Sequence, residues 1–165
     1  MFYEAAFNLG QAQMELRKWG NAIKSYKKVP EGSPLHHRAL YQSGRSKRFG
    51  GKDAEAIPFY KEFLEHYANN PMANDVAFEL AELEFEKGGQ NGGADSVKRL
   101  TALLGKKPNA VLRQKTLFKL GIVQFSEENH EASAAAFEEM LKGPPVGLAI
   151  DAAWQAGEAR RLVAI

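Results

Sequence analysis

The stretch Ala6-Phe7-Asn8-Leu9-Gly10 recurs four times in modified form along this chain of 165 residues. Its later copies are Leu40-Tyr41-Gln42-Ser43-Gly44, Ala77-Phe78-Glu79-Leu80-Ala81, Leu117-Phe118-Lys119-Leu120-Gly121 and Ala153-Trp154-Gln155-Ala156-Gly157. Each copy ends on a tiny residue, and these residues fall at positions 10, 44, 81, 121 and 157. Intervals of this size, roughly 34 to 40 residues, are typical of repeats built from two helices.

A second pattern lies between these stretches, in which a small residue is followed four positions later by an aromatic one. The pairs are Ala22 with Tyr26, Ala56 with Tyr60, and Ser133 with Phe137. A spacing of four places both residues on one face of a helix. The corresponding segment from about Ala94 to Leu104 is apolar but lacks the aromatic residue. With turn-forming Gly, Pro and Asn residues between the segments, the sequence predicts an all-α fold of nine helices and no strands.

The tiny residues indicate close packing between the two helices of each hairpin. Gly or Ala lets the first helix approach the second, where Ala or Ser opens the same contact and the aromatic residue fills the space beside it. We expect a bulky residue at Gly44 to overpack the contact, at a cost of about 1–3 kcal/mol. We also expect Leu9 and Leu120 to be buried, so that truncation of either to Ala costs about 2–5 kcal/mol.

The composition is that of an ordinary globular protein, with 44% hydrophobic and 25% charged residues. A formal net charge of +2 gives no global argument for binding nucleic acid or a membrane surface. The chain has no cysteine, which excludes disulfides and thiolate metal sites. No apolar run approaches the ~18 residues of a membrane span, and the first residues do not resemble a signal segment.

These residues resemble the tetratricopeptide repeat, whose signature combines Leu-Gly, Ala, an aromatic residue and a late Pro. The first repeat has Leu9, Gly10, Ala22, Tyr26 and Pro34; the second keeps Gly44, Ala56 and Tyr60, with Pro71 a few residues late; the fourth has Leu120, Gly121, Phe137 and Pro145, with Ser133 in place of Ala. The resemblance implies one domain over residues 1–165, a right-handed superhelical solenoid of about four and a half repeats. The repeats would span residues 3–36, 37–72, 73–109, 110–147 and, in part, 148–165 of a longer protein.

One region is similar to a variant of this repeat found in bacterial envelope proteins. It comprises Phe63-Leu64-Glu65-His66-Tyr67, Asn70-Pro71, and the segment from Ala73 to Gly88. Outer-membrane assembly lipoproteins and the Tol-Pal coordinator carry that variant and hold periplasmic partners. The similarity implies a bacterial protein that is periplasmic or associated with the outer membrane, with a cytoplasmic location as the alternative.

The resemblance further implies a non-catalytic scaffold that holds a protein or peptide partner along a concave wall of first helices. The aromatic residue of each recurring stretch should face that wall. It can either pack against neighbouring hairpins, which is the more frequent case, or anchor a partner; the second possibility is strongest for Tyr41 and Trp154. The predicted partner-contacting residues are Phe7, Gln11, Arg38, Tyr41, Gln42, Arg45, Arg48, Phe78, Glu79, Glu82, Phe118 and Trp154.

Charge along the predicted wall changes sign. Residues 36 to 52 carry five basic residues and no acid, whereas Glu79 and Glu82 lie beside Phe78 on the next first helix. This arrangement favours a partner of complementary mixed charge, although both runs can equally be solvated faces that neutralise each other. Phe7 and Gln11 occupy positions where members that bind chaperone tails carry Lys and Asn, so the carboxylate clamp of that subgroup is absent.

The sequence gives no support for catalysis, a cofactor or a metal site. His36 and His37 are expected in a turn, and His66 and His130 belong to different repeats without a carboxylate at ligand spacing. Residues 88 to 93 are rich in glycine but precede no Gly-Lys-Ser/Thr, so we interpret them as a flexible linker inside the third repeat. The acidic residues of the following first helix also argue against nucleic acid as a partner.

The last predicted helix, residues 150–165, has an apolar side and no second helix to cover it. Such a face indicates an atypical terminal cap, a chain cut from a longer array, or a contact with another subunit. We favour the second alternative, with self-association through this helix as its consequence. An alternative to the scaffold hypothesis is a regulatory or substrate-recruiting domain of a larger enzyme, which the sequence of the full-length protein would reveal.

Overall fold

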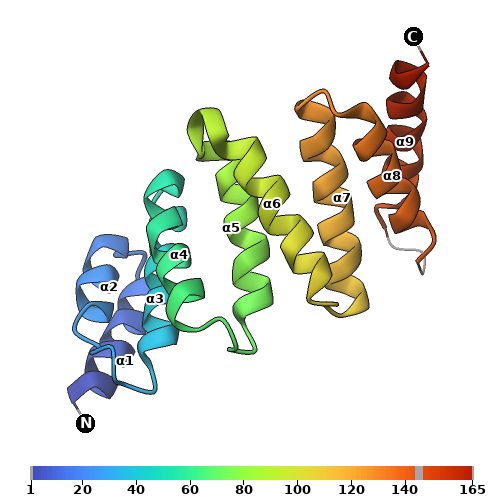
Figure 1. Cartoon of the computed structure of the whole chain (residues 1–165). Coiled ribbons are helices and arrows are strands. Elements are labelled where there is room, and N and C mark those ends of the chain that lie inside the picture. The colour runs from blue at the N-terminus through green and yellow to red at the C-terminus, as the bar shows by residue number, and fades with distance from the viewer. Residues whose placement is uncertain (1, 144–146, 165) are drawn as a thin grey trace. The chain divides into compact units, whose positions relative to one another are not determined.

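The computed structural model describes residues 2–143 and 147–164, and within them the chain is all-helical, as predicted (Figure 1). The described residues form nine α-helices, two short 3-10 turns and no strand. The helices are α1 (Phe2–Glu15), α2 (Trp19–Tyr26), α3 (His36–Phe49), α4 (Ile57–His66), α5 (Ala73–Lys87), α6 (Gly92–Gly105), α7 (Ala110–Ser126), α8 (His130–Leu141) and α9 (Ala149–Val163). Pro145 and Ile165, which entered the predictions above, lie outside the described residues.

The helices group into two compact units, residues 1–76 and residues 77–165. In unit 1, α1 packs against α2, α2 against α3, and α3 against α4. In unit 2, α6 packs against α7, α7 against α8, and α8 against α9. Packing between consecutive helices is what a chain of helical hairpins requires, because each hairpin buries its apolar side against its neighbours.

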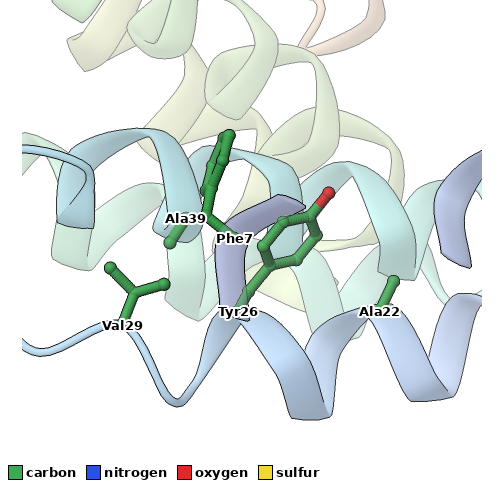
Figure 2. Close-up of a cluster of buried hydrophobic side chains, with 5 residues drawn as sticks. All are labelled: Phe7, Ala22, Tyr26, Val29 and Ala39. Carbon is green, nitrogen blue, oxygen red and sulfur yellow. The ribbon is translucent and has the colours of Figure 1, made fainter. Parts of the chain in front are cut away.

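A small hydrophobic core joins the first three helices of unit 1. Its buried members are Phe7, Ala22, Tyr26, Val29 and Ala39. Figure 2 shows Ala22 and Tyr26 on the same side of α2, with the ring of Phe7 beside that of Tyr26. The two ring centroids lie 5.6 Å apart, within the range of favourable aromatic pairs. The predicted spacing of four residues on the second helix therefore produces a single buried face.

Three tiny residues lie directly against aromatic rings, which confirms the predicted packing. A Cβ atom on Gly10 would collide with the ring of Tyr26, one on Gly44 with Tyr60, and one on Gly121 with Phe137. We call this arrangement the ring–glycine contact. The three rings are buried, at 1% exposure or less, so they have no free space into which to move. Only glycine allows the two helices to approach this closely.

The α5–α6 hairpin of unit 2 is closed differently. Its tiny residue is Ala81, and Val97 on α6 packs into the same cluster where the other hairpins have an aromatic ring. Ala81 is larger than the glycine of the other hairpins, and Val97 is smaller than their aromatic ring, so the two changes in size offset each other. The hairpin also contains an ion pair, in which Arg99 Nε and Nη2 donate to the two carboxylate oxygens of Glu84 at 2.7 and 2.8 Å.

The glycine-rich segment of residues 88–93 is not a flexible linker, so that prediction was wrong. Gly89 has a φ of +71°, residues Gly89–Asn91 form a 3-10 turn, and Gly92 and Gly93 begin α6 as buried residues. A Cβ on Gly92 would collide with the carbonyl oxygen of Glu84 in α5. The glycines are therefore needed for the close approach of two backbones.

The α7–α8 hairpin explains a departure from the repeat signature. Ser133, which stands where Ala is usual, is fully buried, and its Oγ donates to the carbonyl oxygen of Gly121 at 2.8 Å. The Ser133 hydroxyl thus has a hydrogen-bond partner inside the ring–glycine contact.

An ion pair joins α8 to α9. The guanidinium of Arg160 in α9 donates to both carboxylate oxygens of Glu138 in α8 at 2.7 and 2.8 Å.

The predicted burial of Leu9 was wrong, because this side chain is 50% exposed. Leu120, at the corresponding place in α7, is partly buried against the cluster of Ala81, Leu100 and Val123. Leu100 belongs to α6, the helix that precedes α7. In the described chain no helix precedes α1, so Leu9 lacks the surface on which Leu120 packs. The signature Leu is buried by the preceding hairpin, not by its own.

Candidate partner-binding face

Side chains of α1 and α3 in unit 1 form a continuous polar and aromatic surface, which we call the α1/α3 face. It comprises Gln11 of α1 and Arg38, Tyr41 and Arg45 of α3, with Phe7 of α1 buried beneath Arg38. The guanidinium carbon of Arg38 lies 5.1 Å from the centroid of the Phe7 ring. This cation–π contact joins the two helices. Phe7 is only 3% exposed, so it is a platform for Arg38 and part of the core at once.

Arg45 makes two further contacts of the same kind. Its guanidinium carbon lies 5.8 Å from the ring centroid of Tyr41 and 5.2 Å from that of Phe49. Tyr41 is partly buried and stacks on Tyr60 of α4, with centroids 5.8 Å apart and an interplanar angle of 28°. Phe49 in turn contacts Trp19 of α2, and the centroids of the two rings lie 5.5 Å apart. Arg45 therefore contacts two rings, and both contacts restrict the position of its guanidinium.

A buried tyrosine supports this surface from below. The hydroxyl of Tyr26 donates to Gln11 Oε1 at 3.0 Å, and the side chain is 1% exposed. Burial raises the pKa of Tyr26 to about 12, and the nearby charge of Arg45 opposes the rise only in part. The phenol therefore stays neutral at physiological pH and serves as a hydrogen-bond donor that orients Gln11.

The two guanidinium groups are free to bind an anion. Within the part of the chain that the structure describes, neither Arg38 nor Arg45 forms an ion pair with a carboxylate. Arg38 is exposed and Arg45 partly buried. An arginine that stacks on an aromatic ring keeps its N–H groups directed along the edge of the plane, where they can donate to a carboxylate in a bidentate manner. The α1/α3 face can thus hold acidic side chains.

The other predicted contact residues of α3 lie beside this face. Gln42 is partly buried; its Oε1 lies 3.5 Å from Arg45 Nη1, and its carbonyl oxygen accepts a hydrogen bond from Ser46 Oγ at 2.7 Å. Arg48 is also partly buried. Ser46 Oγ in addition lies 2.7 Å from Met14 Sδ of α1. Residues on this side of α3 therefore help to hold α1 and α3 together.

The predicted residues of unit 2 belong to α5, α7 and α9. Phe78 and Phe118 are partly buried and pack against hydrophobic clusters, Phe118 at 5.7 Å from the ring centroid of Phe137. Glu82 forms an ion pair with Lys119 of α7 at 3.4 Å, so this acidic residue is neutralised within its own unit. Glu79 is partly buried. Trp154 of α9 is 64% exposed.

The rings of His36, His37 and His66 gather around Tyr67 in unit 1. His36 and His37 begin α3, so their predicted place in a turn was wrong. His36 Nδ1 lies 2.7 Å from the Tyr67 hydroxyl oxygen, and the rings of His37 and His66 lie 5.7 and 6.3 Å from that of Tyr67. Burial, with the charge of Arg38, lowers the pKa of His37. The cluster joins the start of α3 to the end of α4.

The described residues bring together no group of three or more His, Cys, Asp or Glu side chains that could hold a metal ion. A hollow of about 780 Å³ in unit 2 lies at the α7–α8 turn and is lined in part by Glu128, His130 and Glu131. No described helix is both long and apolar enough to cross a membrane.

Comparisons with known proteins agree with this architecture. The family model of the tetratricopeptide repeat matches residues 4–34 and 38–70. No curated protein matches the chain by sequence. A crystal structure of MamA protein superposes with a TM-score of 0.72 at 20% identity, covering 99% of this chain and 88% of that one.

Two further solved structures resemble the chain. A tetratricopeptide repeat protein from Parabacteroides merdae ATCC 43184 has a TM-score of 0.80 at 20% identity over 96% of this chain, which spans 60% of that protein. A Podosopora anserina putative kinesin light chain with nearly identical TPR-like repeats has a TM-score of 0.69 at 13% identity, covering 98% of this chain and 86% of that one. The chain therefore contains tetratricopeptide repeats, matched by sequence in unit 1, and has the fold of tetratricopeptide repeat proteins along its length.

Proposed function

We propose that this protein is a non-catalytic scaffold that holds a protein or peptide partner on the α1/α3 face. The observation that carries the proposal is the placement of Arg38 and Arg45 on aromatic rings, without a carboxylate partner among the described residues. Each guanidinium contacts an aromatic ring and keeps N–H donors that no carboxylate among the described residues accepts. Such groups can form bidentate hydrogen bonds to the carboxylates of a partner.

The partner that fits this surface is an acidic segment with apolar or aromatic side chains. Its carboxylates would accept hydrogen bonds from Arg38 and Arg45, and its apolar side chains would pack against the exposed part of Tyr41. Because both arginines are already ordered by their ring contacts, little side-chain entropy is lost when the partner binds. Gln11, oriented by Tyr26, adds an amide that can donate to the partner backbone.

A second contact surface in unit 2 belongs to the same proposal. Phe78 and Phe118 are partly buried, and Glu79 and Glu82 lie on the same helix as Phe78. Since Glu82 is paired with Lys119, we expect this surface to contribute mainly apolar contact and little net charge. The partner's own charge should therefore be determined by the basic α1/α3 face.

Capture of partners from extracts of the source organism tests the proposal. The 165-residue chain is immobilised, and the proteins that bind it are compared with those bound by the Tyr41→Ala and Arg45→Glu variants. Lys24→Glu is the matched control, because it reverses a charge on an exposed residue of α2 in the same unit. We expect the two α3 variants to lose a partner that the control retains. If both variants keep every partner of the unmodified chain, the assignment of the α1/α3 face is wrong.

We further infer that the scaffold acts in the bacterial envelope. The support is the similarity of residues 63–67, 70–71 and 73–88 to the repeat variant of envelope proteins. Fractionation of the native cells into cytoplasm, periplasm and membranes tests this, with detection by an antibody against the chain. Recovery with periplasmic or outer-membrane markers is expected; recovery with cytoplasmic markers alone would contradict the inference.

A further inference from the structure

A small cavity of about 200 Å³ lies in unit 1, where α2, α3 and α4 meet. Much of its wall is apolar and includes Val29, Ala39, Leu40 and Phe59. The first three of these residues are buried, so this part of the wall belongs to the interior of the unit. A cavity of ~150 Å³ with apolar walls can hold benzene. The space is therefore large enough for a branched aliphatic or phenyl group.

The cavity lies where the second repeat departs from the recurring stretch. Ser43 is buried and lines the cavity. It occupies the fourth position of that stretch, where other copies have Leu9, Leu80 and Leu120. A leucine at this position packs on the preceding hairpin, as Leu120 does in unit 2. Because serine is much shorter, the corresponding space in unit 1 is left unfilled and its wall gains a hydroxyl group.

The early end of α2 opens the same space. This helix ends at Tyr26, the residue whose ring closes the first ring–glycine contact. In the next hairpin, α4 continues beyond its corresponding ring residue, Tyr60, to His66. Beyond the ring, α4 is thus longer than α2 by more than one turn. The chain that leaves α2 lines the cavity through Val29. Two separate departures from the repeat therefore produce one cavity between two neighbouring hairpins.

Two exposed side chains of opposite charge also line the cavity. They are Lys27, which follows α2, and Glu62 of α4, and among the residues that the structure describes neither forms an ion pair. A ligand with only a carboxylate would be repelled by Glu62, and a ligand with only an amine would be repelled by Lys27. A zwitterion can place its carboxylate at Lys27 and its ammonium group at Glu62, so that both of its charges are paired.

We propose that this cavity binds a free α-amino acid with an apolar side chain, such as leucine. The side chain of the ligand enters the apolar part of the cavity and occupies the space that the leucine of the recurring stretch fills in other repeats. Its carboxylate and ammonium groups remain at the edge, beside Lys27 and Glu62. The site shares no residue with the α1/α3 face, so this proposal does not rest on the proposed function.

Two-dimensional NMR of the isotope-labelled chain, titrated with L-leucine, measures the binding and locates it. We expect saturable shifts in the amide signals of Val29, Ala39 and Ser43. Isocaproate, which lacks the ammonium group, and isopentylamine, which lacks the carboxylate, should each bind about tenfold more weakly, because one charge-assisted hydrogen bond is lost. Glycine, which lacks the side chain, should cause no saturable shift. Absence of saturable shifts with L-leucine would overturn the proposal, as would equally tight binding of either analogue.

Substitutions test whether L-leucine occupies this cavity. Ser43→Leu restores the usual residue and fills the space, so it should abolish binding and raise the melting temperature of the unliganded chain. Lys27→Glu reverses an exposed charge and should leave the fold intact, but weaken binding by about tenfold. Lys28→Glu changes the neighbouring exposed lysine, which does not line the cavity, and should bind as the unmodified chain does. Unchanged binding by Ser43→Leu or by Lys27→Glu would overturn the proposal.

Discussion

The α3–α4 hairpin of unit 1 and the α5–α6 hairpin of unit 2 solve the same packing problem with different chemistry. In α3–α4, Gly44 lies against the buried ring of Tyr60. In α5–α6, Ala81 and Val97 occupy the cluster, and a bidentate ion pair between Glu84 and Arg99 joins the two helices. The first contact depends on shape, and the second on a charge pair.

The difference teaches which features of the repeat are interchangeable. In both hairpins, the size of the tiny residue on the first helix is matched by the size of a residue on the second helix. Gly44 is combined with the large ring of Tyr60, and the larger Ala81 is combined with the smaller Val97. The ion pair between Glu84 and Arg99 belongs to the α5–α6 hairpin. We therefore expect substitutions in the two hairpins to lower the free energy of unfolding for different physical reasons and by different amounts.

The largest effect is expected for Arg99→Ala in α6. Glu84 is 2% exposed, and the substitution would remove the guanidinium that donates two hydrogen bonds to this buried carboxylate. The free energy of unfolding should fall by about 3–5 kcal/mol. Urea unfolding followed by circular dichroism measures the change. Arg99→Lys, which keeps one charge but not the bidentate geometry, should lose less; equal stability of the unmodified chain and Arg99→Ala would refute the role of the pair.

A smaller but clear effect is expected for Gly44→Ala in α3. The new methyl group collides with the ring of Tyr60, which is buried and stacked on Tyr41 and so cannot turn away. The free energy of unfolding should decrease by about 1–3 kcal/mol, although alanine is the better helix former. The same urea experiment measures it. A stabilised Gly44→Ala variant would mean that the hairpin is not closed by the ring–glycine contact.

The exchange of one hairpin type for the other should reveal coupling between the two positions. Val97→Tyr alone overpacks the contact against Ala81, whereas the double variant with Ala81→Gly recreates a ring–glycine contact. We expect the coupling free energy from a double-mutant cycle to be about 1 kcal/mol in favour of the double variant. Strict additivity of the two substitutions would show that the residues do not share one space.

The smallest effect is expected for Gly157→Ala in α9, and it has the opposite sign to Gly44→Ala. No atom lies within 4 Å of the new methyl group, so only the helix propensity changes. The monomer should become more stable by up to about 1 kcal/mol. Thermal unfolding followed by circular dichroism measures the change. A marked loss of stability would indicate that another part of the chain packs against Gly157.

Much of the fold could be predicted from the sequence because the decisive contacts recur. Gly10, Gly44 and Gly121 each precede their ring by sixteen residues, and this regularity identifies both helices of a hairpin. The burial of Leu9 was predicted wrongly because the sequence pattern of one repeat does not show which surface the preceding hairpin supplies. Residues 88–93 were misjudged because glycines needed for close backbone approach have the same composition as a linker.

The candidate site was predictable in position but not in detail. The positions of Arg38, Tyr41 and Arg45 on one side of a helix follow from their spacing. The contact of Arg38 with Phe7 joins two helices that are distant in sequence, so only the fold reveals it. The ion pair of Glu84 and Arg99 left no signal either, since Glu84 stands within a run of similar acidic residues.

The central claim is that the α1/α3 face binds acidic partners, and a peptide titration tests it most directly. A fluorescent peptide of alternating glutamate and leucine is titrated with the chain, and its anisotropy is measured at low and physiological salt. We expect saturable binding that weakens with salt, is lost in Arg45→Glu and persists in Lys24→Glu. Binding of equal strength by the unmodified chain and Arg45→Glu would contradict it.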